Sequence, residues 1–313
     1  MRAPDLTVEQ VQKICPNFTQ IEYVGRGGQK TVFSGVFAGT KYAIKFLDLT
    51  SIQNQQAPNS AITQDPHITV SPVEDIREDV LARAKREIDI MDRCETSTLV
   101  KLGPIGMTLV DYDNKKLLYF TEELISGDDL HNIIRRDKFI SLNEGIQIGI
   151  DIATAIKHLW NINMVHRDVK PRNIMRRDTG GYVLLDTGLA FDLSDESLTA
   201  AFITVGTPIY MSPEQLKNVR RGIDFRSDLF LLGIVLYEAL TGQHPFFNRG
   251  INSMQLVANI VTNPIESPNK VRKDLPNSLN TIIMRLLAKE PHLRFKSCDS
   301  LMEKLLQARE EIQ

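Results

Sequence analysis

The chain has 313 residues, enough for about two domains or lobes, since compact domains usually contain about 100–200 residues. Its 42% hydrophobic and 24% charged residues exclude wholesale disorder, and its net charge of −2 argues against a general nucleic-acid-binding protein, which is usually basic. Three widely separated cysteines, an odd and sparse count, fit a reducing cytosol.

Strand patterns dominate the first part of the chain. Residues 5–15 carry apolar side chains at loosely helical spacing, so we expect a short amphipathic helix there. Apolar residues then recur at every second position, which is typical of half-buried strands. The predicted strands cover 21–24, 31–37 and 42–46. The segments between them are short enough for hairpin turns.

A polar loop and a long helix follow these strands. Residues 50–70 are rich in Gln, Asn and Pro, and this insertion is longer than the loops that compact domains normally keep. Ser71-Pro72-Val73-Glu74 has the order of a helix start, with Ser at the N-cap and Pro at the first helical position. We therefore predict a helix from there to about Arg93.

The second part of the chain has mainly helical patterns. Strand spacing continues within 105–124, most clearly at 117–120, and helical spacing dominates after Gly127. The longest predicted helices cover 143–160, 228–240, 279–289 and 300–312. This order predicts two α+β lobes rather than an alternating parallel sheet. The expected boundaries are an N-terminal extension at 1–17, a strand-rich lobe at 18–124 and a helical lobe at 125–313.

No segment predicts a secretory signal or a membrane span. The first 18 residues lack the continuous apolar run of a signal peptide. The longest apolar run, 229–237, has about half of the ~20 residues that a membrane helix needs, and Glu238 follows it directly. We therefore expect a soluble, cytoplasmic chain that binds neither membranes nor nucleic acid.

A glycine-rich turn at 24–32 is the first candidate phosphate site, because glycines let backbone N–H groups approach a phosphate closely. A dinucleotide fingerprint requires a helix after the glycines, whereas Thr31 and Val32 continue as a strand. A Walker loop requires Gly directly before Lys-Thr, where this chain has Gln29. A strand–turn–strand arrangement over a nucleotide and an ordinary glycine-rich hairpin both remain open.

Three downstream motifs decide between these alternatives. Residues 166–173, His-Arg-Asp-Val-Lys-Pro-Arg-Asn, match the catalytic-loop pattern H-R-D-x-x-x-x-N. Asp186-Thr187-Gly188 stands where D-F-G is expected, and 206–214 matches the end of an activation segment. Over about 23–294 the chain therefore closely resembles eukaryotic-type (Hanks-type) serine/threonine protein kinases. This resemblance implies a bilobal α+β protein-kinase fold, with a β-rich N-lobe that carries one regulatory helix and a mainly helical C-lobe.

The resemblance also implies which residues perform phosphoryl transfer from ATP to protein Ser/Thr hydroxyls. Asp168 matches the aspartate that accepts or orients the hydroxyl proton, and Lys170 matches the lysine next to the γ-phosphate. Asn173 and Asp186 match the Mg²⁺ ligands, and both offer the hard oxygen donors that Mg²⁺ prefers. Lys45 matches the strand lysine that contacts the α- and β-phosphates.

A glutamate on the long helix should hold Lys45. Turning about 100° per residue places one set of apolar residues on a common face, with Glu87 at its edge. These residues are Val80, Ala84, Ile88 and Met91. Glu78 and Asp89 fall on the opposite side, so Glu87 is the predicted partner of Lys45.

The nucleotide site is expected to be apolar, with backbone hydrogen bonds at the interlobe hinge. The residues assigned to it by the resemblance are Val24, Gly25, Arg26, Gly27, Gly28, Val32, Ala43, Lys45, Glu87, Glu122, Leu124 and Met175. Thr121 is assigned the gatekeeper position of this pocket, and 122–124 the hinge. Val24, Val32 and Ala43 would form the roof, and Met175 the floor.

Four further matches concern architecture and regulation. Glu214 and Arg294 correspond to a buried ion pair, and Asp228 to the residue that anchors the catalytic-loop backbone. His166 is expected to be a packed, hydrogen-bonded residue rather than a base. Arg167 is expected to bind a phosphate on the activation segment. The candidate phosphorylation sites are Ser194, Ser197, Thr199 and Thr204, of which the two threonines are preferred.

Two residues depart from the family pattern. Lys30 replaces the third glycine of the turn, where its cation could approach the phosphates. Thr187 replaces the Phe of D-F-G, so the packing of that ring is lost. The insertion at 50–70 has no counterpart in the family pattern.

The sequence therefore predicts a cytoplasmic, ATP- and Mg²⁺-dependent Ser/Thr protein kinase that also phosphorylates itself. A pseudokinase that only binds and scaffolds is a second possibility, which Lys30 and Thr187 favour mildly. A kinase-like small-molecule phosphotransferase is a third, although such enzymes generally lack a segment such as 206–214.

Overall fold

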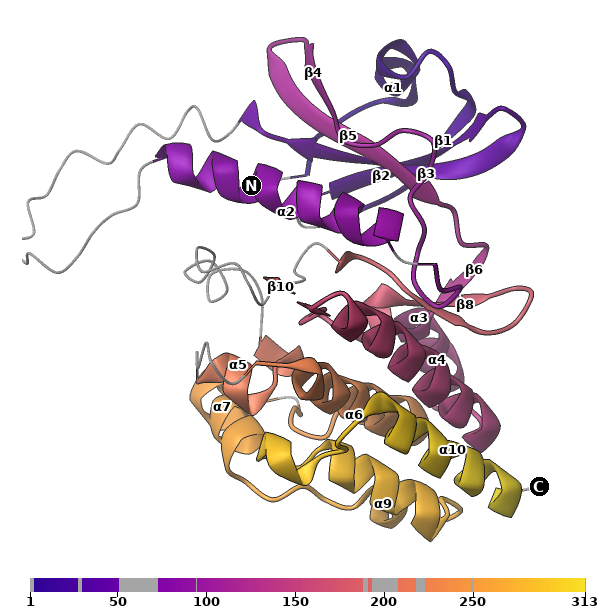
Figure 1. Cartoon of the computed structure of the whole chain (residues 1–313), viewed down its shortest axis with the longest axis vertical. Helices are drawn as coiled ribbons and strands as arrows, with labels where there is room; N and C mark the ends of the chain where they lie inside the picture. The colour runs from indigo at the N-terminus through magenta and orange to yellow at the C-terminus, as the bar shows by residue number, and fades with distance from the viewer. Residues whose placement is uncertain are drawn as a thin grey trace, which may run out of the picture. The chain divides into compact units, whose positions relative to one another are not determined.

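The chain divides into two compact units in its computed structural model, which is shown in Figure 1. Unit 1 contains residues 1–93 and 100–124, and unit 2 contains 94–99 and 125–313. The structure describes residues 3–27, 30–50, 73–93, 95–187, 191–192, 208–217, 223–248 and 250–312. The polar insertion, from residue 51 onward, lies outside the described residues.

Unit 1 is built on one antiparallel sheet of five strands in the order β1-β2-β3-β5-β4. The strands are β1 (Thr19–Arg26), β2 (Lys30–Phe37), β3 (Thr40–Asp48), β4 (Thr108–Tyr112) and β5 (Lys115–Glu123). The helices of this unit are α1 (Val8–Ile14) and α2 (Val73–Arg93). The expected hairpin strands and both expected helices are therefore present.

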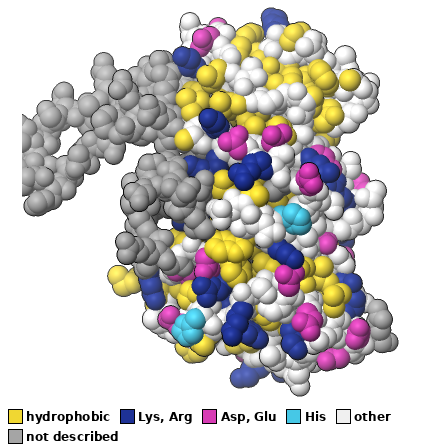
Figure 2. All heavy atoms as spheres, viewed as in Figure 1, with side chains coloured by type: hydrophobic (Ala, Val, Ile, Leu, Met, Phe, Trp, Pro, Cys, Tyr) yellow, Lys and Arg dark blue, Asp and Glu magenta, His cyan; other side chains and the backbone are white. Residues whose placement is uncertain are grey.

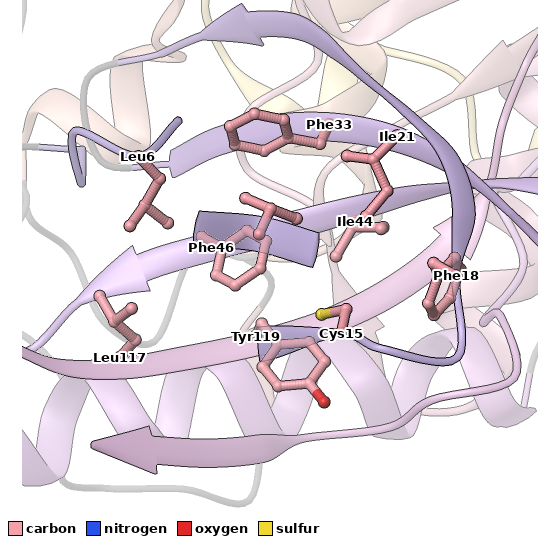
Figure 3. Packing of buried hydrophobic residues seen from close by; sticks show 10 residues of the cluster. Leu6, Cys15, Phe18, Ile21, Phe33, Ile44, Phe46, Leu117 and Tyr119 are labelled. Carbon is pink, nitrogen blue, oxygen red and sulfur yellow. The ribbon is translucent and has the colours of Figure 1, made fainter. Parts of the chain in front are cut away.

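One face of this sheet forms a hydrophobic core (Figure 3). Phe33, Ile44, Phe46 and Tyr119 alternate with residues of the other face and pack against one another. Residues 1–17, expected to be an extension outside the strand-rich lobe, are part of this unit from the first described residue onward. Leu6, Val11 and Cys15 contribute to the core. A reciprocal capping box between Thr7 and Gln10 begins α1, which positions these apolar side chains over the sheet.

The opposite face of the sheet carries the residues expected to bind nucleotide. Directly paired residues of antiparallel strands share a face. Lys45 pairs with Val32 on one side and with Phe120 on the other. Two residues along β3, Ala43 pairs with Glu122. The register therefore places all five of these side chains on one face, away from the hydrophobic core of Figure 3.

Unit 2 is mainly helical. Its helices are α3 (Leu130–Asp137), α4 (Leu142–Asn161), α5 (Pro213–Leu216), α6 (Phe225–Thr241), α7 (Ser253–Val261), α8 (Pro268–Val271), α9 (Asn277–Leu286) and α10 (Cys298–Ile312). Short strands form β6 (Gly127–Asp129), β7 (Met164–Val165), β8 (Ile174–Arg177), β9 (Tyr182–Leu184) and β10 (Phe191–Asp192). Sheets β6-β8-β9 and β7-β10 support the loop between β7 and β8.

Helix α6 forms the centre of unit 2. It is apolar on nearly every side and almost completely buried, as expected for a helix that other helices surround. Asp224 caps its N-terminus, and Gly242, with φ of 73°, ends it in the left-handed conformation that favours glycine. None of the helices in the described part of the chain has the length and hydrophobicity that crossing a membrane requires.

Candidate active site

The loop between β7 and β8 brings three predicted site residues together around one carboxylate. Lys170 Nζ donates to both carboxylate oxygens of Asp168, at 2.8 and 2.6 Å. Asn173 Nδ2 donates to the carboxylate and to the backbone carbonyl of the same aspartate, both at 2.9 Å. The carboxylate is thus held in one orientation by a cation and an amide, with charge-assisted hydrogen bonds.

Asp228 holds the backbone that carries this carboxylate. It lies at the N-terminal end of α6 and is completely buried. Its two oxygens accept from the backbone N–H groups of His166, at 2.8 Å, and Arg167, at 2.7 Å. Burial raises the pKa of Asp228, and attraction by His166 and these hydrogen bonds oppose that rise. The anchoring role expected for Asp228 is confirmed.

The loop adopts a backbone conformation that needs such an anchor. Arg167 has φ of 67°, in a region that residues other than glycine seldom adopt. Gln215 of α5 donates to the Arg167 carbonyl at 3.0 Å, which fixes the loop from a second side. The ring of His166 is buried, and its Nε2 lies 3.2 Å from the Leu185 carbonyl. His166 is therefore a packed, hydrogen-bonded residue, as expected.

Backbone contacts bring Asp186 toward the same loop. The N–H group of Leu185 donates to the Asn173 carbonyl at 2.7 Å, one residue before Asp186. Asp186 itself has φ of 59°, and the following Thr187 is buried. The third residue of this motif, Gly188, lies outside the described residues, as do the candidate phosphorylation sites Ser194, Ser197, Thr199 and Thr204.

The donor atoms of this loop fit Mg²⁺. Asn173 uses its N–H₂ group for Asp168, so its carbonyl oxygen remains the donor available to a cation. Asp186, which follows Leu185 and its backbone hydrogen bond to Asn173, would supply a carboxylate. Mg²⁺ usually keeps several waters and takes one or two protein ligands together with substrate phosphates. The described residues contain no group of three or more His, Cys, Asp or Glu that could hold a metal ion.

The predicted contact between Lys45 and Glu87 is present in unit 1, but each residue has a closer partner. Lys45 Nζ lies 3.8 Å from Glu87 Oε1 and 2.8 Å from Glu122 Oε2. Lys30 Nζ donates to both oxygens of Glu87, at 2.8 and 2.7 Å. Glu87 is 1% exposed, Glu122 4% and Lys45 6%. The lysine that replaces the third glycine of the turn thus contacts Glu87 directly.

The gatekeeper assignment of Thr121 is wrong. Thr121 pairs with Ile44 and lies on the core face of the sheet, where its Oγ1 donates to the Ile105 carbonyl at 2.9 Å. Successive residues of a strand point to opposite faces, so the side chain on the Lys45 face is the next one, Glu122. The resemblance assigns Glu122 to the hinge, where backbone hydrogen bonds are expected. In the structure its side chain is buried beside Lys45.

The other residues assigned to the nucleotide site occupy several environments. Val32 and Ala43 share the face of Lys45, and Leu124 follows β5. Val24 is exposed, as is Arg26, which donates to the Ala3 carbonyl and lies 3.4 Å from Asp5. Of the glycines, Gly25 lies near the end of β1, and Gly27 donates to the Lys30 carbonyl at 2.8 Å, whereas Gly28 is outside the described residues. Met175 lies in β8 of unit 2.

The expected ion pair between Glu214 and Arg294 is confirmed. Arg294 is 1% exposed, and its two terminal nitrogens donate to the two carboxylate oxygens at 2.6 and 2.9 Å. Ser227 of α6 adds a third bond to Glu214 at 2.6 Å. This bidentate pair joins α5, which follows the activation segment, to the segment before α10.

Reasoning from sequence alone missed two features of the site: the contact of Lys30 with Glu87 and the contact of Glu122 with Lys45. The second contact depends on the register between strands, and the first on how β2 meets α2. A shift of one residue moves a side chain to the other face of a sheet, and no local sequence signal specified how β5 pairs with β3. Once one pair such as Lys45 with Phe120 is known, the alternation of side chains along β5 identifies Glu122 as the next residue on the Lys45 face.

Comparison with known proteins agrees with this geometry. The family model described as protein kinase domain matches residues 18–307. The probable serine/threonine-protein kinase PknB of Corynebacterium glutamicum is 28% identical over 286 residues, which are 89% of this chain and 40% of that protein. The serine/threonine-protein kinase PknH of Mycobacterium bovis is 32% identical over 220 residues, 70% of this chain and 35% of that protein. The chain spans about a third of the length of several curated relatives.

The match covers both units and includes the catalytic loop, the sheet that carries Lys45 and the ion pair of Arg294. The five-stranded antiparallel sheet of unit 1 and the helices of unit 2 confirm the expected α+β protein-kinase fold. The resemblance deduced from the three motifs is likewise confirmed, and the chain belongs to the protein kinase domain family.

Proposed function

We propose that the protein is an ATP- and Mg²⁺-dependent Ser/Thr protein kinase, which transfers the γ-phosphoryl group of ATP to Ser or Thr hydroxyls of proteins and of itself. The observation that carries this proposal is the Asp168 carboxylate, held by Lys170 and Asn173 on an anchored loop. Phosphoryl transfer depends mainly on positioning and electrostatic stabilisation, and this loop supplies both.

Asp168 orients the substrate hydroxyl and receives its proton. The hydroxyl oxygen forms a bond to the γ-phosphorus while the bond from that phosphorus to the β,γ-bridging oxygen breaks, and ADP leaves. Lys170 is in contact with Asp168 and offers a positive charge to the oxygens of the transferred group. Because Asn173 and Lys170 hold the carboxylate beforehand, little reorganisation is needed at the moment of transfer.

The remaining roles follow from the donor atoms available. Asn173 and Asp186 would hold Mg²⁺, which neutralises phosphate charge when bound. Lys45 would position the α- and β-phosphates, and Glu87 would hold Lys45. The backbone of 24–27 would approach the phosphates, and Val32 and Ala43 would contact the base.

A protein substrate suits the surface better than a polyanion. Lysine, arginine and acidic side chains are interspersed on the face in Figure 2 rather than separated by sign. Nucleic-acid-binding surfaces usually gather Lys and Arg on one face. We propose a cytoplasmic location, which is supported by the sparse cysteines, two of them buried and free.

The test is transfer of label from γ-labelled ATP with Mg²⁺ to a generic protein substrate, with Asp168→Asn as the matched variant. Wild type should label Ser and Thr residues of the substrate, and the variant should not. Equal labelling by the two proteins would refute the proposal.

Two controls distinguish the other functions of this fold. A pseudokinase would be stabilised thermally by MgATP but would transfer no label. A small-molecule phosphotransferase would leave all proteins unlabelled while consuming ATP in the presence of small hydroxyl compounds.

A further inference from the structure

Four charged side chains, three of them buried and that of Lys30 half-buried, lie next to one another in unit 1, three on the proposed nucleotide-binding face of the sheet and one, Glu87, on α2. We call this group, Lys30, Glu87, Lys45 and Glu122, the charge cluster. Its members alternate in sign: Lys30 contacts Glu87 at 2.7 Å, Glu87 lies 3.8 Å from Lys45, and Lys45 lies 2.8 Å from Glu122. Two lysines and two glutamates sum to zero formal charge.

Both cations of the charge cluster also share one aromatic ring. Lys30 Nζ lies 5.7 Å and Lys45 Nζ 6.0 Å from the centroid of Phe120, which is fully buried. An ammonium within about 6 Å of a ring centroid is attracted by the ring. The two lysines are therefore neighbours in one environment of low dielectric constant, where charges act on each other strongly.

Lys30 and Glu122 also affect each other electrostatically. Burial raises the pKa of the Glu122 carboxyl, and Lys45 opposes that rise most strongly. Glu87 raises this pKa further, and Lys30 lowers it. Loss of the Lys30 charge therefore shifts the protonation equilibrium of the Glu122 carboxyl.

Removing either Lys30 or Glu122 changes the charge of this group. Without Lys30, the carboxylates of Glu87 and Glu122 would share Lys45 within the cluster, and the formal charge of its members would become −1. Without Glu122, that formal charge would become +1. Removing one partner of a buried ion pair is strongly destabilising.

We propose that Lys30 and Glu122 are a charge-compensating pair of positioning residues, which act on phosphoryl transfer through Glu87 and Lys45. Lys30 keeps Glu87 paired when Lys45 turns toward phosphate, so α2 is held without depending on Lys45. Glu122 holds Lys45 at the sheet until phosphate competes for it. The nucleotide step of this inference rests on the proposed function, whereas the charge compensation does not.

The pair predicts opposite effects on nucleotide affinity. Lys30→Met leaves an extra negative charge near the triphosphate, so both the Kd and the KM for MgATP should rise at least about tenfold, or about 1.4 kcal/mol. Glu122→Met removes a competitor for Lys45, so the Kd should fall. The double variant removes one charge of each sign and so keeps the net charge of wild type, and its Kd should return to within about threefold of wild type.

The experiment is a double-mutant cycle with two readouts, on wild type, Lys30→Met, Glu122→Met and the double variant. The first readout is the Tm of the protein without nucleotide. Each single variant should lower Tm by about 5 °C or more, and the double variant should lose clearly less than the sum. The second is the Kd for MgATP by calorimetry, with KM and kcat measured where transfer occurs.

Two controls make the result specific. Lys41 of β3 and Glu22 of β1 form an exposed ion pair in the same sheet, at 2.6 Å, and their cycle with Lys41→Met and Glu22→Gln should show no coupling in Tm or Kd. Lys30→Arg keeps the positive charge and should keep the wild-type Kd for MgATP, a result that a role in packing alone would not give.

Additive losses in Tm and Kd for Lys30 and Glu122 would overturn the proposal. If Lys30→Met does not fold, recovery of folding in the double variant supports the proposal and continued failure overturns it. If the wild type binds MgATP but transfers no phosphate, the proposed kinase function is refuted. The Tm and Kd cycles still test the charge compensation in that case. If the wild type does not bind MgATP, the proposed effect of Lys30 and Glu122 on nucleotide binding is refuted.

Discussion

Lys45 has two separate tasks at the residue scale, and substitutions can separate them. It is the proposed contact of the α- and β-phosphates, and it also balances Glu122 at 2.8 Å in a buried site. Lys45→Met should therefore abolish transfer and also lower the free energy of unfolding by about 3–5 kcal/mol, because a carboxylate is left without its cation. Lys45→Met combined with Glu122→Met should regain most of that stability and none of the activity. Urea unfolding and transfer assays on the same samples check this, and recovered activity in the double variant would contradict the phosphate role.

His244 predicts an acid-sensitive contribution to stability. Burial lowers the pKa of His244 to about 4, and its Nδ1 accepts from the N–H groups of Phe246 and Phe247 at 3.2 and 3.1 Å. The unfolded chain, with a histidine pKa near 6.5, binds more protons than the folded chain between about pH 4 and 6.5. The stabilisation is thus present above about pH 6.5 and is lost as the pH falls, by roughly 1–2 kcal/mol at pH 5.

Unfolding curves at pH 7 and pH 5 should show a smaller loss of stability in His244→Gln than in wild type. His292→Gln, at an exposed histidine, should behave like wild type, and an equal loss in all three proteins would exclude His244 as the cause.

At the scale of elements, Glu214 and Arg294 hold α5 in place. Both are buried, and Arg294 also donates to the backbone carbonyls of Arg226, Ala288 and Lys289. Glu214→Ala and Arg294→Ala should each lower the free energy of unfolding by about 3–5 kcal/mol. The exposed pair of Lys157 and Asp299, at 2.6 Å, is the matched control, and Lys157→Ala should cost less than about 1 kcal/mol. Urea unfolding of the three variants measures this difference, and similar small losses in all three would show that burial adds nothing to the first pair.

Local sequence patterns predicted the elements well, because most strands and helices here have one face that must be buried. The hairpin strands of unit 1, α2 and α4 lie where the two-residue or 3.6-residue period indicated them, and α6 lies where the apolar run indicated a buried helix. The contiguous catalytic-loop motif likewise identified Asp168, Lys170 and Asn173, which the structure brings together.

Contacts that depend on strand register could not be predicted in the same way. Thr121 and Glu122 are adjacent in sequence and lie on opposite faces of β5, so an assignment that is wrong by one residue exchanges a core threonine for a buried carboxylate. The partner of Lys30 depends on how β2 meets α2, which are separated by 57 residues at the contact with Glu87. Only the folded sheet specifies these neighbours.

At the scale of the whole molecule, each unit carries a distinct part of the proposed machinery. Unit 1 carries the charge cluster on one face of its sheet and a hydrophobic core on the other (Figure 3). Unit 2 carries the anchored catalytic loop on β7 and β8, supported by the N-terminal end of α6. In each unit, ion pairs and hydrogen bonds between elements hold the polar groups to which the proposed phosphoryl transfer assigns a role.

The most direct test of the central claim is the rate of phosphoryl transfer by Asp168→Asn relative to wild type at saturating MgATP. Asparagine keeps the size of the side chain and its place beside Lys170 and Asn173, but it cannot receive the hydroxyl proton. If Asp168 acts as proposed, the rate should fall about 10²–10⁴-fold, the range typical of a positioned acid or base, while the Kd for MgATP stays within about threefold. A rate within about tenfold of wild type, in a variant that binds MgATP normally, would contradict the account.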